Sequence, residues 1–352
     1  MKKKKILIDL SILKHLYCGL GQIALNYGNY FKTHHTGKEN YEIYLLLPKK
    51  MFGIFGDKVN YIATSVWNKH FPFLMPRFDV WHEIHQLCRY KPAGRKTKVV
   101  LTIHDFNFVY EKKGVKLEKY LNRIQNKINR ADKITCISNF AKEETRKHAS
   151  LNNKLIDVIY NGVEQLDSKP AKQPVQVKGG IPFFFSIGQV RQKKNFHVLI
   201  PMMKLFPEKM LYIAGDNNSS YGKYIEEKII EEGVKNVCLL GEISNEERIW
   251  LYRNCEAFLF PSLLEGFGLP VIEAMSFGKP VFSSQETSLK EIGGECAYFW
   301  EDFEPEAMKK LIDNNLQNFY LSAEPAQKNI EYAHSFSYDK HMKRYLEVYK
   351  EL

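Results

Sequence analysis

Short apolar runs rich in β-branched residues alternate with helical patterns along this chain, and this alternation most constrains its fold. In the first half, Leu117, Leu121, Ile124 and Ile128 fall on one face of a helix between two such runs. Strands that alternate with helices predict a parallel sheet covered by helices on both faces. The expected strands of this half are KILIDLS from Lys5, YEIYLLL from Tyr41, DVWHEI from Asp79, KVVLTIH from Lys98, KITCIS from Lys133 and LIDVIY from Leu155.

The same alternation resumes after a polar stretch. EQLDSKPAKQPVQVKGG, which begins at Glu164, is rich in Pro, Gln and Lys and is typical of a linker. The strands expected after it are FFFSIG from Phe183, MLYIAG from Met210, VCLLG from Val237, AFLFPS from Ala257 and PVFSS from Pro280. A chain of 352 residues is long enough for two domains. We therefore predict an α/β protein with two doubly wound, Rossmann-like domains, residues 1–165 and 181–335, joined by a hinge over 166–180.

Positive charge is concentrated in the first half. Residues 1–170 contain 30 Lys and Arg against 15 Asp and Glu, a net of +15, and the remainder contains 21 against 25, a net of −4. The basic half indicates an anionic partner: a phosphorylated substrate, an acidic lipid surface or nucleic acid. Ordinary solvated lysines are the alternative explanation.

The cysteines and the N-terminus bear on the compartment. The six cysteines are scattered, without a CxxC pair or zinc-like spacing, as expected for buried thiols in a reducing cytoplasm. The opening MKKKKILIDLSIL resembles a signal peptide only superficially, because Asp9 interrupts its apolar run and no cleavage site follows. No stretch approaches the roughly 18 apolar residues of a membrane span. We expect a cytoplasmic protein whose contact with the inner face of an anionic membrane is peripheral.

Two glutamates flank a glycine-rich corner in SLLEGFGLPVIEAM. Gly266 and Gly268 let the backbone approach a ligand closely, and Pro270 suits the first turn of the following helix. The unpaired N–H groups of that turn lie at the positive end of the helix dipole, so the corner predicts a phosphate site. Glu265 precedes the corner and Glu273 lies about one turn into the helix, so we expect them to accept hydrogen bonds from hydroxyls on either side of a phosphate, a sugar on one side and a ribose on the other. The alternative is a helix-capping Glu265 and a solvated Glu273.

This corner, followed by EAMSFGKPV, resembles the retaining GT-B glycosyltransferases of family 4. The resemblance spans nearly the whole chain, because other segments stand in the order that the family shows: VVLTIHDFNFV, ADKITCISNFAKEE, VIYNGV, SIGQVRQKKNFHVLI, LYIAGDN, LLGEISNEERIWLYRNC and SLKEIGGECAYFW. It implies two Rossmann-like domains that face a central cleft. FSYDKHMKRYLEVYKEL, about residues 336–352, would be the C-terminal helix that crosses back to the first domain.

The resemblance implies a donor site for a nucleotide-diphosphate sugar, GDP- or UDP-linked, mainly in the second domain. The diphosphate would bind the amides of Gly268 and Leu269 and the Lys194 ammonium, and the ribose would bind Glu273. Glu265, with the amides of Gly266 and Phe267, would hold the transferred sugar. The other residues that it places at the donor or the acceptor are Gly19, Gly21, His104, Gly188, Gln189, Arg191, Lys193, Gly215 and Ile243.

The expected catalytic residues are His104, Lys194 and Glu265. Fixed positive groups at the leaving diphosphate would lower the barrier electrostatically. The family retains the anomeric configuration, usually by a proposed front-face route in which the leaving phosphate helps to deprotonate the acceptor, so Glu265 is not expected to be a nucleophile paired with a second carboxyl group about 5–5.5 Å away. No cofactor and no metal ion is expected, and the sequence contains no Asp-x-Asp pair.

Three positions leave alternatives open. Many relatives carry Arg where this chain has Gln189, so either Arg191 or Lys193 compensates or the homologue is altered or inactive. His104 is either a sugar-facing side chain or a strand-end histidine satisfied by backbone. Gly19 and Gly21 in CGLGQIA also match GxGxxA of dinucleotide sites, but they come seven residues after the first strand, too far for that tight turn.

WHEIHQL is not the HExxH motif of zinc enzymes and is interpreted as a strand end that enters an acceptor-side loop. The leading hypothesis is a transferase that moves a hexose, with GDP-mannose slightly favoured, to a saccharide or lipid-linked acceptor in cell-surface polysaccharide or glycolipid synthesis. A nucleotide-sugar epimerase of the same fold is the second hypothesis. Nucleic-acid binding is the third, and since no such module is visible, no nucleic acid is expected as a partner.

Overall fold

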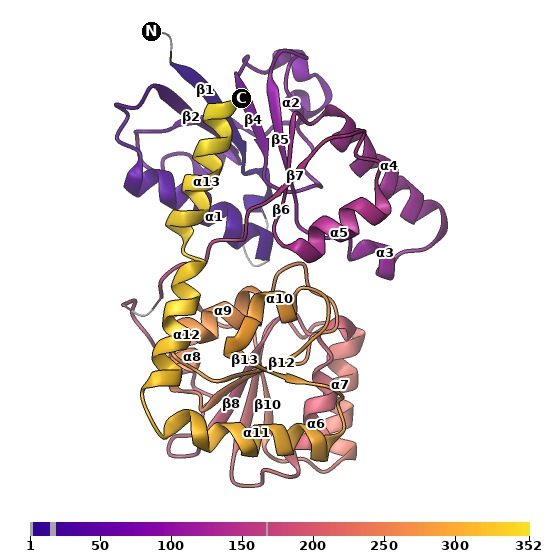
Figure 1. Ribbon diagram of the computed structural model, residues 1–352, viewed down its shortest axis with the longest axis vertical. Coiled ribbons are helices and arrows are strands. Elements are labelled where there is room, and N and C mark those ends of the chain that lie inside the picture. Colours follow the sequence, from indigo (N-terminus) through magenta and orange to yellow (C-terminus); the bar gives the residue numbers. More distant parts are fainter. Residues whose placement is uncertain (1–2, 15–18, 167) are drawn as a thin grey trace. The chain divides into compact units, whose positions relative to one another are not determined.

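The computed structural model describes residues 3–14, 19–166 and 168–352. These residues form two compact units: unit 1 comprises residues 1–162 and 338–352, and unit 2 comprises residues 163–337. Each unit contains one parallel sheet with helices packed around it (Figure 1). The α/β class with two doubly wound domains, which the alternating pattern predicts, is confirmed.

The sheet of unit 1 has the strand order β3-β2-β1-β4-β5-β6-β7, with every pair parallel. Its strands are β1 (Lys4–Asp9), β2 (Tyr41–Leu47), β3 (Asn60–Ala63), β4 (Val80–Glu83), β5 (Lys98–Ile103), β6 (Lys133–Cys136) and β7 (Ile156–Val158). The sequence prediction missed β3. This edge strand has four residues, none of them fully buried, so it lacks the apolar run that marks the other strands.

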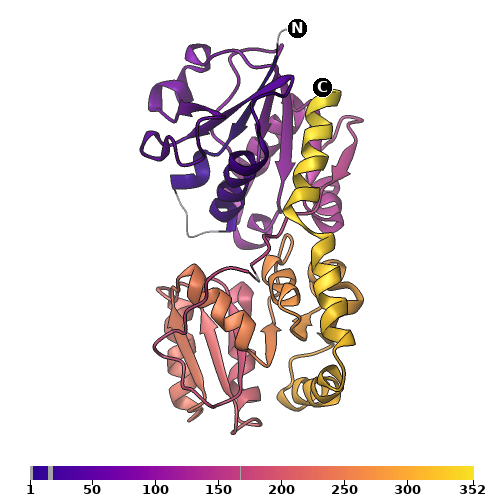
Figure 2. The ribbon, with the colours of Figure 1, turned by 90° about the vertical axis from the view of Figure 1, so that its left-hand side faces the viewer.

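The helices of unit 1 include the last helix of the chain. They are η1 (Ser11–Lys14), α1 (Gly19–His34), η2 (Lys49–Met51), α2 (Val66–His70), η3 (Pro72–Leu74), α3 (Phe108–Glu111), α4 (Gly114–Arg130), α5 (Asn139–His148) and α13 (Tyr338–Glu351). On α13, the Tyr345 hydroxyl lies 2.8 Å from Thr102 Oγ1, and the Tyr349 hydroxyl lies 2.6 Å from His82 Nδ1. These buried contacts fasten α13 to the first domain, as expected for a GT-B fold (Figures 1 and 2).

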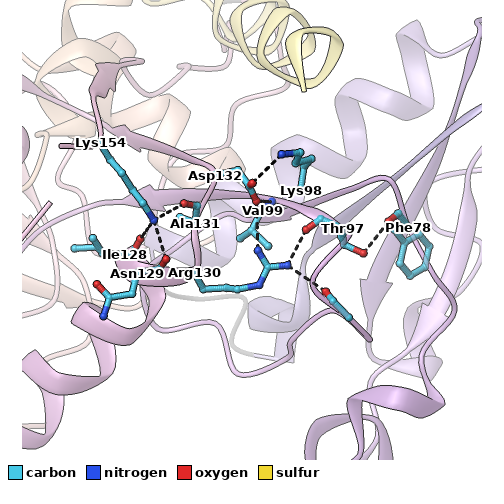
Figure 3. A network of polar contacts seen from close by, with 11 residues as sticks. Phe78, Thr97, Lys98, Val99, Ile128, Asn129, Arg130, Ala131, Asp132 and Lys154 are labelled. Carbon is cyan, nitrogen blue, oxygen red and sulfur yellow. Dashed lines mark hydrogen bonds and ion pairs between the residues drawn. The ribbon is translucent and has the colours of Figure 1, made fainter. Parts of the chain in front are cut away.

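Charged side chains donate hydrogen bonds to main-chain carbonyls at the end of α4 and in the loop beside it (Figure 3). Lys154 Nζ donates to the carbonyls of Ile128, Asn129 and Ala131 at 2.7, 2.8 and 2.7 Å. A cation at a helix C-terminus satisfies carbonyls that have no partner within the helix and complements the helix dipole. The Arg130 guanidinium, in the last turn of α4, donates to Thr97 O at 2.7 Å and so ties α4 to the chain just before β5.

The sheet of unit 2 has the strand order β10-β9-β8-β11-β12-β13, again all parallel. Its strands are β8 (Phe183–Ile187), β9 (Met210–Ala214), β10 (Val237–Gly241), β11 (Ala257–Phe260), β12 (Val281–Ser284) and β13 (Ala297–Trp300). The five predicted strands are present, and the unpredicted β13 adds a sixth at one edge.

Short and long helices cover both faces of this second sheet. They are η4 (Gln192–Lys194), η5 (Phe196–Val198), α6 (Leu199–Met203), α7 (Ser220–Glu231), α8 (Asn245–Asn254), α9 (Leu269–Ser276), α10 (Leu289–Gly293), η6 (Gly294–Cys296), α11 (Pro305–Tyr320) and α12 (Glu324–Ser335). The polar stretch before β8 belongs to unit 2, where Lys172 N donates to Glu246 O at 3.1 Å. The chain therefore passes between the units at 162/163 and again at 337/338.

Candidate functional site

The strand order of unit 2 defines where a ligand would bind. Successive strands run outward from β8 in one direction and from β11 in the other, so the order reverses between these two neighbours. In open parallel sheets, ligands bind beyond the carboxyl ends of the strands at such a switch point. Lys194 follows β8, and Glu265 follows β11. The predicted donor-site residues of unit 2 thus cluster on the loops at this edge.

Lys194 and Glu265 meet directly at the switch point. Lys194 Nζ lies 2.5 Å from Glu265 Oε1, which also accepts a hydrogen bond from Ser262 Oγ at 2.8 Å. The two charged side chains are mostly buried, at 13% and 16% exposure. An ammonium has three donors, and Oε2 of Glu265 has no partner among the described residues, so each group keeps capacity to bind a ligand.

The chain after β8 holds Lys194 in place. The carbonyl of Lys193 accepts hydrogen bonds from Leu263 N at 2.8 Å and from Ser262 Oγ at 3.2 Å, which fastens the β8 loop to the β11 loop. Lys194 Nζ also lies 5.0 Å from the centre of the Phe260 ring. The ammonium is therefore positioned by contacts with β11 and with the loop that follows it, and is not a freely rotating surface lysine.

The glycine corner begins helix α9 without a side-chain cap. Gly268 is the N-cap residue and adopts φ 104°, a conformation that favours glycine. The N–H groups of Gly268 and Leu269 make no hydrogen bond within the described residues, and Pro270 has no N–H. The helix thus presents two amides at the positive end of its dipole, which suits an anion. The Glu265 side chain does not cap α9, contrary to the alternative that the sequence left open.

Two further glycines bring the ends of β8 and β9 together. Gly188 N donates to Ala214 O at 2.9 Å, and a Cβ added to Gly215 would lie 2.1 Å from Gly188 O. A Cβ at Gly188 would lie 3.0 Å from Lys194 Cε. Side chains at either position would therefore push the β8 and β9 loops apart or displace the lysine.

Glu273 is paired rather than solvated. Its carboxylate accepts from Arg248 Nη1 at 3.1 Å and from the Tyr252 hydroxyl at 2.9 Å, and only 15% of its side chain is exposed. The Glu273 charge raises the pKa of Arg248, and burial followed by the same charge raises the pKa of Tyr252. A carboxylate offers about four lone-pair sites, so Glu273 can still accept from a ligand.

Sequence reasoning did not identify Arg248 and Tyr252 as partners of Glu273. The usable signal was local: a Ser-x-x-Glu capping box, Ser244 with Glu247, starts α8. It places residues 248 and 252 four apart on one helix face. Nothing in the sequence indicates that this face turns towards α9.

The remaining unit 2 candidates lie around the same edge. Gln189 is exposed in the loop after β8, and the Arg191 guanidinium lies 3.6 Å from the carboxylate of Asp216, just beyond β9. Ile243 is half-buried between β10 and α8. Donor contacts of Gln189, Arg191, Lys193 and Ile243 stay predictions.

The predicted residues of unit 1 have a different environment. His104 is buried; its Nε2 donates to Ile84 O at 2.8 Å, and its main-chain N–H donates to Gln86 Oε1 at 3.0 Å. Burial lowers the pKa of His104 to about 4, so the ring is neutral near pH 7. Because Nε2 carries the proton that Ile84 O accepts and the ring is neutral, Nδ1 has no proton and can accept a hydrogen bond. Sugar contact by His104 stays a prediction.

Gly19 and Gly21 begin α1, where Gly19 is exposed and Gly21 is buried. Cys18, which starts the motif, lies outside the described residues. Within residues 3–14, 19–166 and 168–352, no helix has the length and apolarity needed to span a bilayer, and no three His, Cys, Asp or Glu side chains are grouped to hold a metal ion.

Comparison with known structures identifies the class of fold. The structure of Anabaena HepE in complex with UDP and glucose superposes with a TM-score of 0.73, covering 99% of this chain and 100% of that chain at 16% sequence identity. The two α/β units, each with a parallel sheet, and the C-terminal helix that belongs to the first unit thus form the GT-B fold.

Sequence comparison then identifies the family. Residues 167–351 match the family described as Glycosyl transferases group 1, and residues 50–165 match Glycosyltransferase Family 4. The first match covers more than half of the chain. The chain therefore belongs to the glycosyl transferases group 1 family and is a glycosyltransferase.

Two curated relatives agree with this family. An uncharacterized glycosyltransferase of Methanocaldococcus jannaschii is 28% identical over 255 residues, which cover 72% of this chain and 68% of that protein. The O-antigen chain mannosyltransferase RfbU of Salmonella typhimurium is 25% identical over 216 residues, which cover 61% of this chain and 60% of that protein. The match thus spans less than two thirds of the mannosyltransferase.

Proposed function

We propose that this protein transfers a hexose from a nucleotide-diphosphate sugar, with retention of anomeric configuration, to a saccharide or lipid-linked acceptor in the synthesis of a cell-surface polysaccharide or glycolipid. The observation that carries the proposal is the Lys194–Glu265 pair at the switch point of unit 2, 2.5 Å apart. Beside it, α9 presents the unpaired amides of Gly268 and Leu269. A cation and two amides suit a diphosphate, and a carboxylate suits the hydroxyls of a sugar.

The residues have separable tasks in this proposal. Negative charge develops on the diphosphate as the glycosidic bond breaks, and the Lys194 ammonium with the two amides stabilises that charge. One preorganised donor of this kind typically contributes about 2.7–4 kcal/mol to the transition state. Oε2 of Glu265 accepts from the transferred sugar, while Oε1 is held by Lys194 and Ser262. Glu265 orients the sugar and does not attack it.

Glu273 would bind the ribose. Arg248 and Tyr252 hold its carboxylate from one side and so fix its direction before the donor arrives. Such preorganisation reduces the side-chain entropy that is lost on binding.

Two observations bear on the identity of the donor. GDP-mannose is favoured because EGFGLP resembles the corner of mannosyltransferases in the family and because RfbU, a relative, is named a mannosyltransferase. The complex of HepE with UDP and glucose makes UDP-glucose the first competitor. The two donors differ in base and sugar, so direct comparison distinguishes them.

A thermal-shift panel of nucleotide sugars tests the donor site. We expect one GDP- or UDP-sugar to raise Tm, and we expect Lys194→Ala to abolish most of that increase. Glu273→Ala also leaves Arg248 and Tyr252 without their partner, so its own Tm falls; the relevant measurement is the ligand-induced shift of each variant. Lys204→Ala, which removes an exposed lysine paired with Glu232, is the matched control. An unchanged shift in both site variants refutes the assignment.

Turnover distinguishes the remaining hypotheses. A transferase should consume the donor rapidly only with an acceptor, whereas conversion of the donor into an isomeric nucleotide sugar without acceptor would indicate an epimerase. Salt-dependent binding of oligonucleotides, with no effect of any nucleotide sugar on Tm, would favour the nucleic-acid hypothesis.

A further inference from the structure

Five large apolar side chains are exposed within nine residues of unit 1. Val66, Trp67, Phe71, Phe73 and Leu74 are exposed by 72%, 68%, 40%, 73% and 54%. We call these five residues, on α2 and η3, the apolar patch. Contiguous exposed apolar surface of this kind on a water-soluble domain marks an interaction site more often than chance exposure does.

The apolar patch is held outward by ordered contacts. Ser65 caps α2 by accepting from Asn68 N at 2.9 Å, and Pro72 begins η3. Met75, directly after the patch, turns inward and packs with Phe78 in the core beside the sheet. The segment is thus ordered by its helix cap and by the burial of Met75, and its aromatic side chains are exposed on an ordered backbone.

The aromatic rings of the patch contact one another. The Trp67 and Phe71 rings stack with centroids 5.8 Å apart, and Phe71 meets Phe73 edge-on at 5.9 Å. The rings form one continuous apolar surface, which a partner can cover as a whole.

The segment that carries the patch and a segment in contact with it are basic in sequence. Residues 64–77 contain two cations and residues 84–97 contain four, which makes six Lys and Arg, and neither segment contains Asp or Glu. The Tyr90 hydroxyl donates to Ser65 O at 3.3 Å and joins the two segments. Within the described ranges none of these cations forms an ion pair. They are Lys69, Arg77, Arg89, Lys91, Arg95 and Lys96.

The basic segment 84–97 is tied to the body of unit 1. Arg123 of α4 donates to the carbonyls of Leu87 and Cys88 at 2.7 and 3.0 Å. Arg130 donates to Thr97 O at 2.7 Å (Figure 3) and to Gly94 O at 3.1 Å. The cations of this segment thus extend from a backbone that is fastened at both ends.

We propose that the apolar patch and the basic segment 84–97 together dock unit 1 on an anionic lipid bilayer. Tryptophan and phenylalanine partition into the interface between headgroups and acyl chains, and clustered Lys and Arg are attracted to anionic headgroups. The patch provides the partitioning into the interface, and the six cations provide the attraction to anionic headgroups. The aliphatic Val66 and Leu74 favour a lipid partner over a nucleic acid, because base stacking uses aromatic planes and has no need of branched aliphatic side chains.

The position of the apolar patch suits an acceptor held in the membrane. α2 follows the carboxyl end of β3 and so leaves the edge of the sheet at which His104 follows β5. Tyr90 joins the basic segment to Ser65, just before α2, whereas the segment ends at the opposite edge, where β5 begins. The docking inference does not depend on the donor site, since none of its residues belongs to unit 2.

Flotation with vesicles tests the inference. We expect the protein to float with phosphatidylglycerol–phosphatidylcholine vesicles and to stay in solution with pure phosphatidylcholine. Trp67→Ser/Phe73→Ser should lower the partition coefficient at least about tenfold, or ~1.4 kcal/mol. Its control is Val115→Ser/Leu155→Ser, because these two side chains are each 82% exposed elsewhere in unit 1. Equal binding of the two double variants, or no binding of the parent protein, overturns the proposal.

The charge term has its own pair of variants. Arg89→Gln/Lys91→Gln, at exposed positions on either side of Tyr90, should weaken binding to anionic vesicles several-fold, and Lys116→Gln/Lys119→Gln, on exposed positions of α4, should not. Raised salt should weaken the parent protein more than the first variant. An equal loss in both variants would mean that net charge alone drives binding and would remove the specific surface.

Depth-dependent quenching locates the patch in the bilayer. Brominated lipids should quench the Trp67 fluorescence of bound protein, and Trp67→Phe should keep binding but lose most of the quenching. Quenching that is unchanged in Trp67→Phe places another tryptophan in the bilayer and refutes the orientation. Dimerisation through the patch, detected as a larger particle that Trp67→Ser/Phe73→Ser dissociates without vesicles present, would also refute it. Donor-induced thermal shifts measured on the same variants keep failure of docking separate from failure of the proposed transferase activity.

Discussion

The carboxyl edges of the two sheets have the same topology and opposite chemistry. In unit 2 the edge collects charged groups that remain partly accessible, such as Lys194 with Glu265. In unit 1 the edge and the adjoining core contain buried histidines that hydrogen-bond to protein groups, such as His104 to Ile84 O. A switch point therefore determines where a ligand can bind, and the local side chains determine which kind of ligand binds there.

Burial explains the difference between the edges. Burial lowers the pKa of His104 and His341 to about 4 and that of His85 to about 3, so these rings are neutral parts of the fold. In unit 2 the cations and carboxylates offset one another's charge while keeping some contact with solvent. The edge of unit 1 therefore offers shape and hydrogen bonds to a ligand, and the edge of unit 2 offers positive charge that can bind an anion.

The largest expected difference between the two units is their loss of stability in acid. A histidine whose pKa is lower in the folded state gives full stability above its ordinary pKa of 6.5 and loses it as pH falls towards the folded value. Between pH 7 and pH 5 each of His85, His104 and His341 should cost unit 1 about 2 kcal/mol, because the unfolded chain takes up the proton first. Unit 2 contains only His197 and His334.

Hydrogen exchange at pH 7 and pH 5, corrected for intrinsic rates, measures this contrast unit by unit. Protection should fall more in unit 1, and His85→Gln should reduce the pH dependence. Equal losses in both units would show that the buried histidines do not account for the difference.

Lys194→Ala should have the next largest effect. Loss of the ammonium at the leaving group should lower kcat about 10²–10³-fold, which is the usual result of removing one transition-state donor. The protein should stay folded, because Ser262 still donates a hydrogen bond to Glu265 Oε1 after the ammonium is removed. Activity within about threefold of the parent, measured with the donor found by thermal shift and with Lys204→Ala as the control, would be incompatible with the proposed role.

Gly215→Ala should disturb the unit 2 edge through packing. Its Cβ would lie 2.1 Å from Gly188 O, and the position has φ 132°. Overpacking of this kind typically costs about 1–3 kcal/mol, and the displaced β8 loop should also weaken donor binding. Gly179→Ala, where a Cβ would meet nothing within 4 Å, is the control and should be nearly neutral in urea unfolding. Similar midpoints for the two variants would contradict the packing argument.

Gln189→Arg should have the smallest effect, and it should be a gain. Gln189 is exposed on the loop that leads to Lys194, so an added cation would attract the diphosphate through solvent. Surface charge pairs contribute about 0.2–1 kcal/mol, which corresponds to at most about a fivefold tighter Kd. Titration of the donor by calorimetry measures it. Weaker binding would indicate that Arg191 or Lys193 already occupies the place that the arginine takes in relatives.

The sequence predicted most strands because central parallel strands are buried on both faces and need continuous apolar runs. It missed β3, an edge strand without a buried residue, and β13, an edge strand whose apolar run AYFW is only four residues long and has one buried residue. The phosphate corner was predictable for a similar reason, since glycine at residue 268 and proline at 270 restrict the backbone locally. The ordered motifs then identified the family, which the comparisons confirmed.

The pairing of side chains was not predictable in the same way. Lys194 and Glu265 are 71 residues apart, and Arg248 and Glu273 are 25 apart. Each pair depends on how neighbouring strands or helices stack. The exposure of Trp67 and Phe73 was equally hidden, because an apolar run in a sequence predicts burial.

The alternating α/β architecture and the glycine corner follow from the amino-acid sequence, because backbone preferences and hydrophobic periodicity act over a few residues, and the excess of positive charge in the first half follows from composition. Which carboxylates are held by cations, which histidines are neutral and which aromatic side chains face solvent became clear only in the folded chain. Those properties depend on burial and on distances between segments far apart in the chain, which the folded sheet sets.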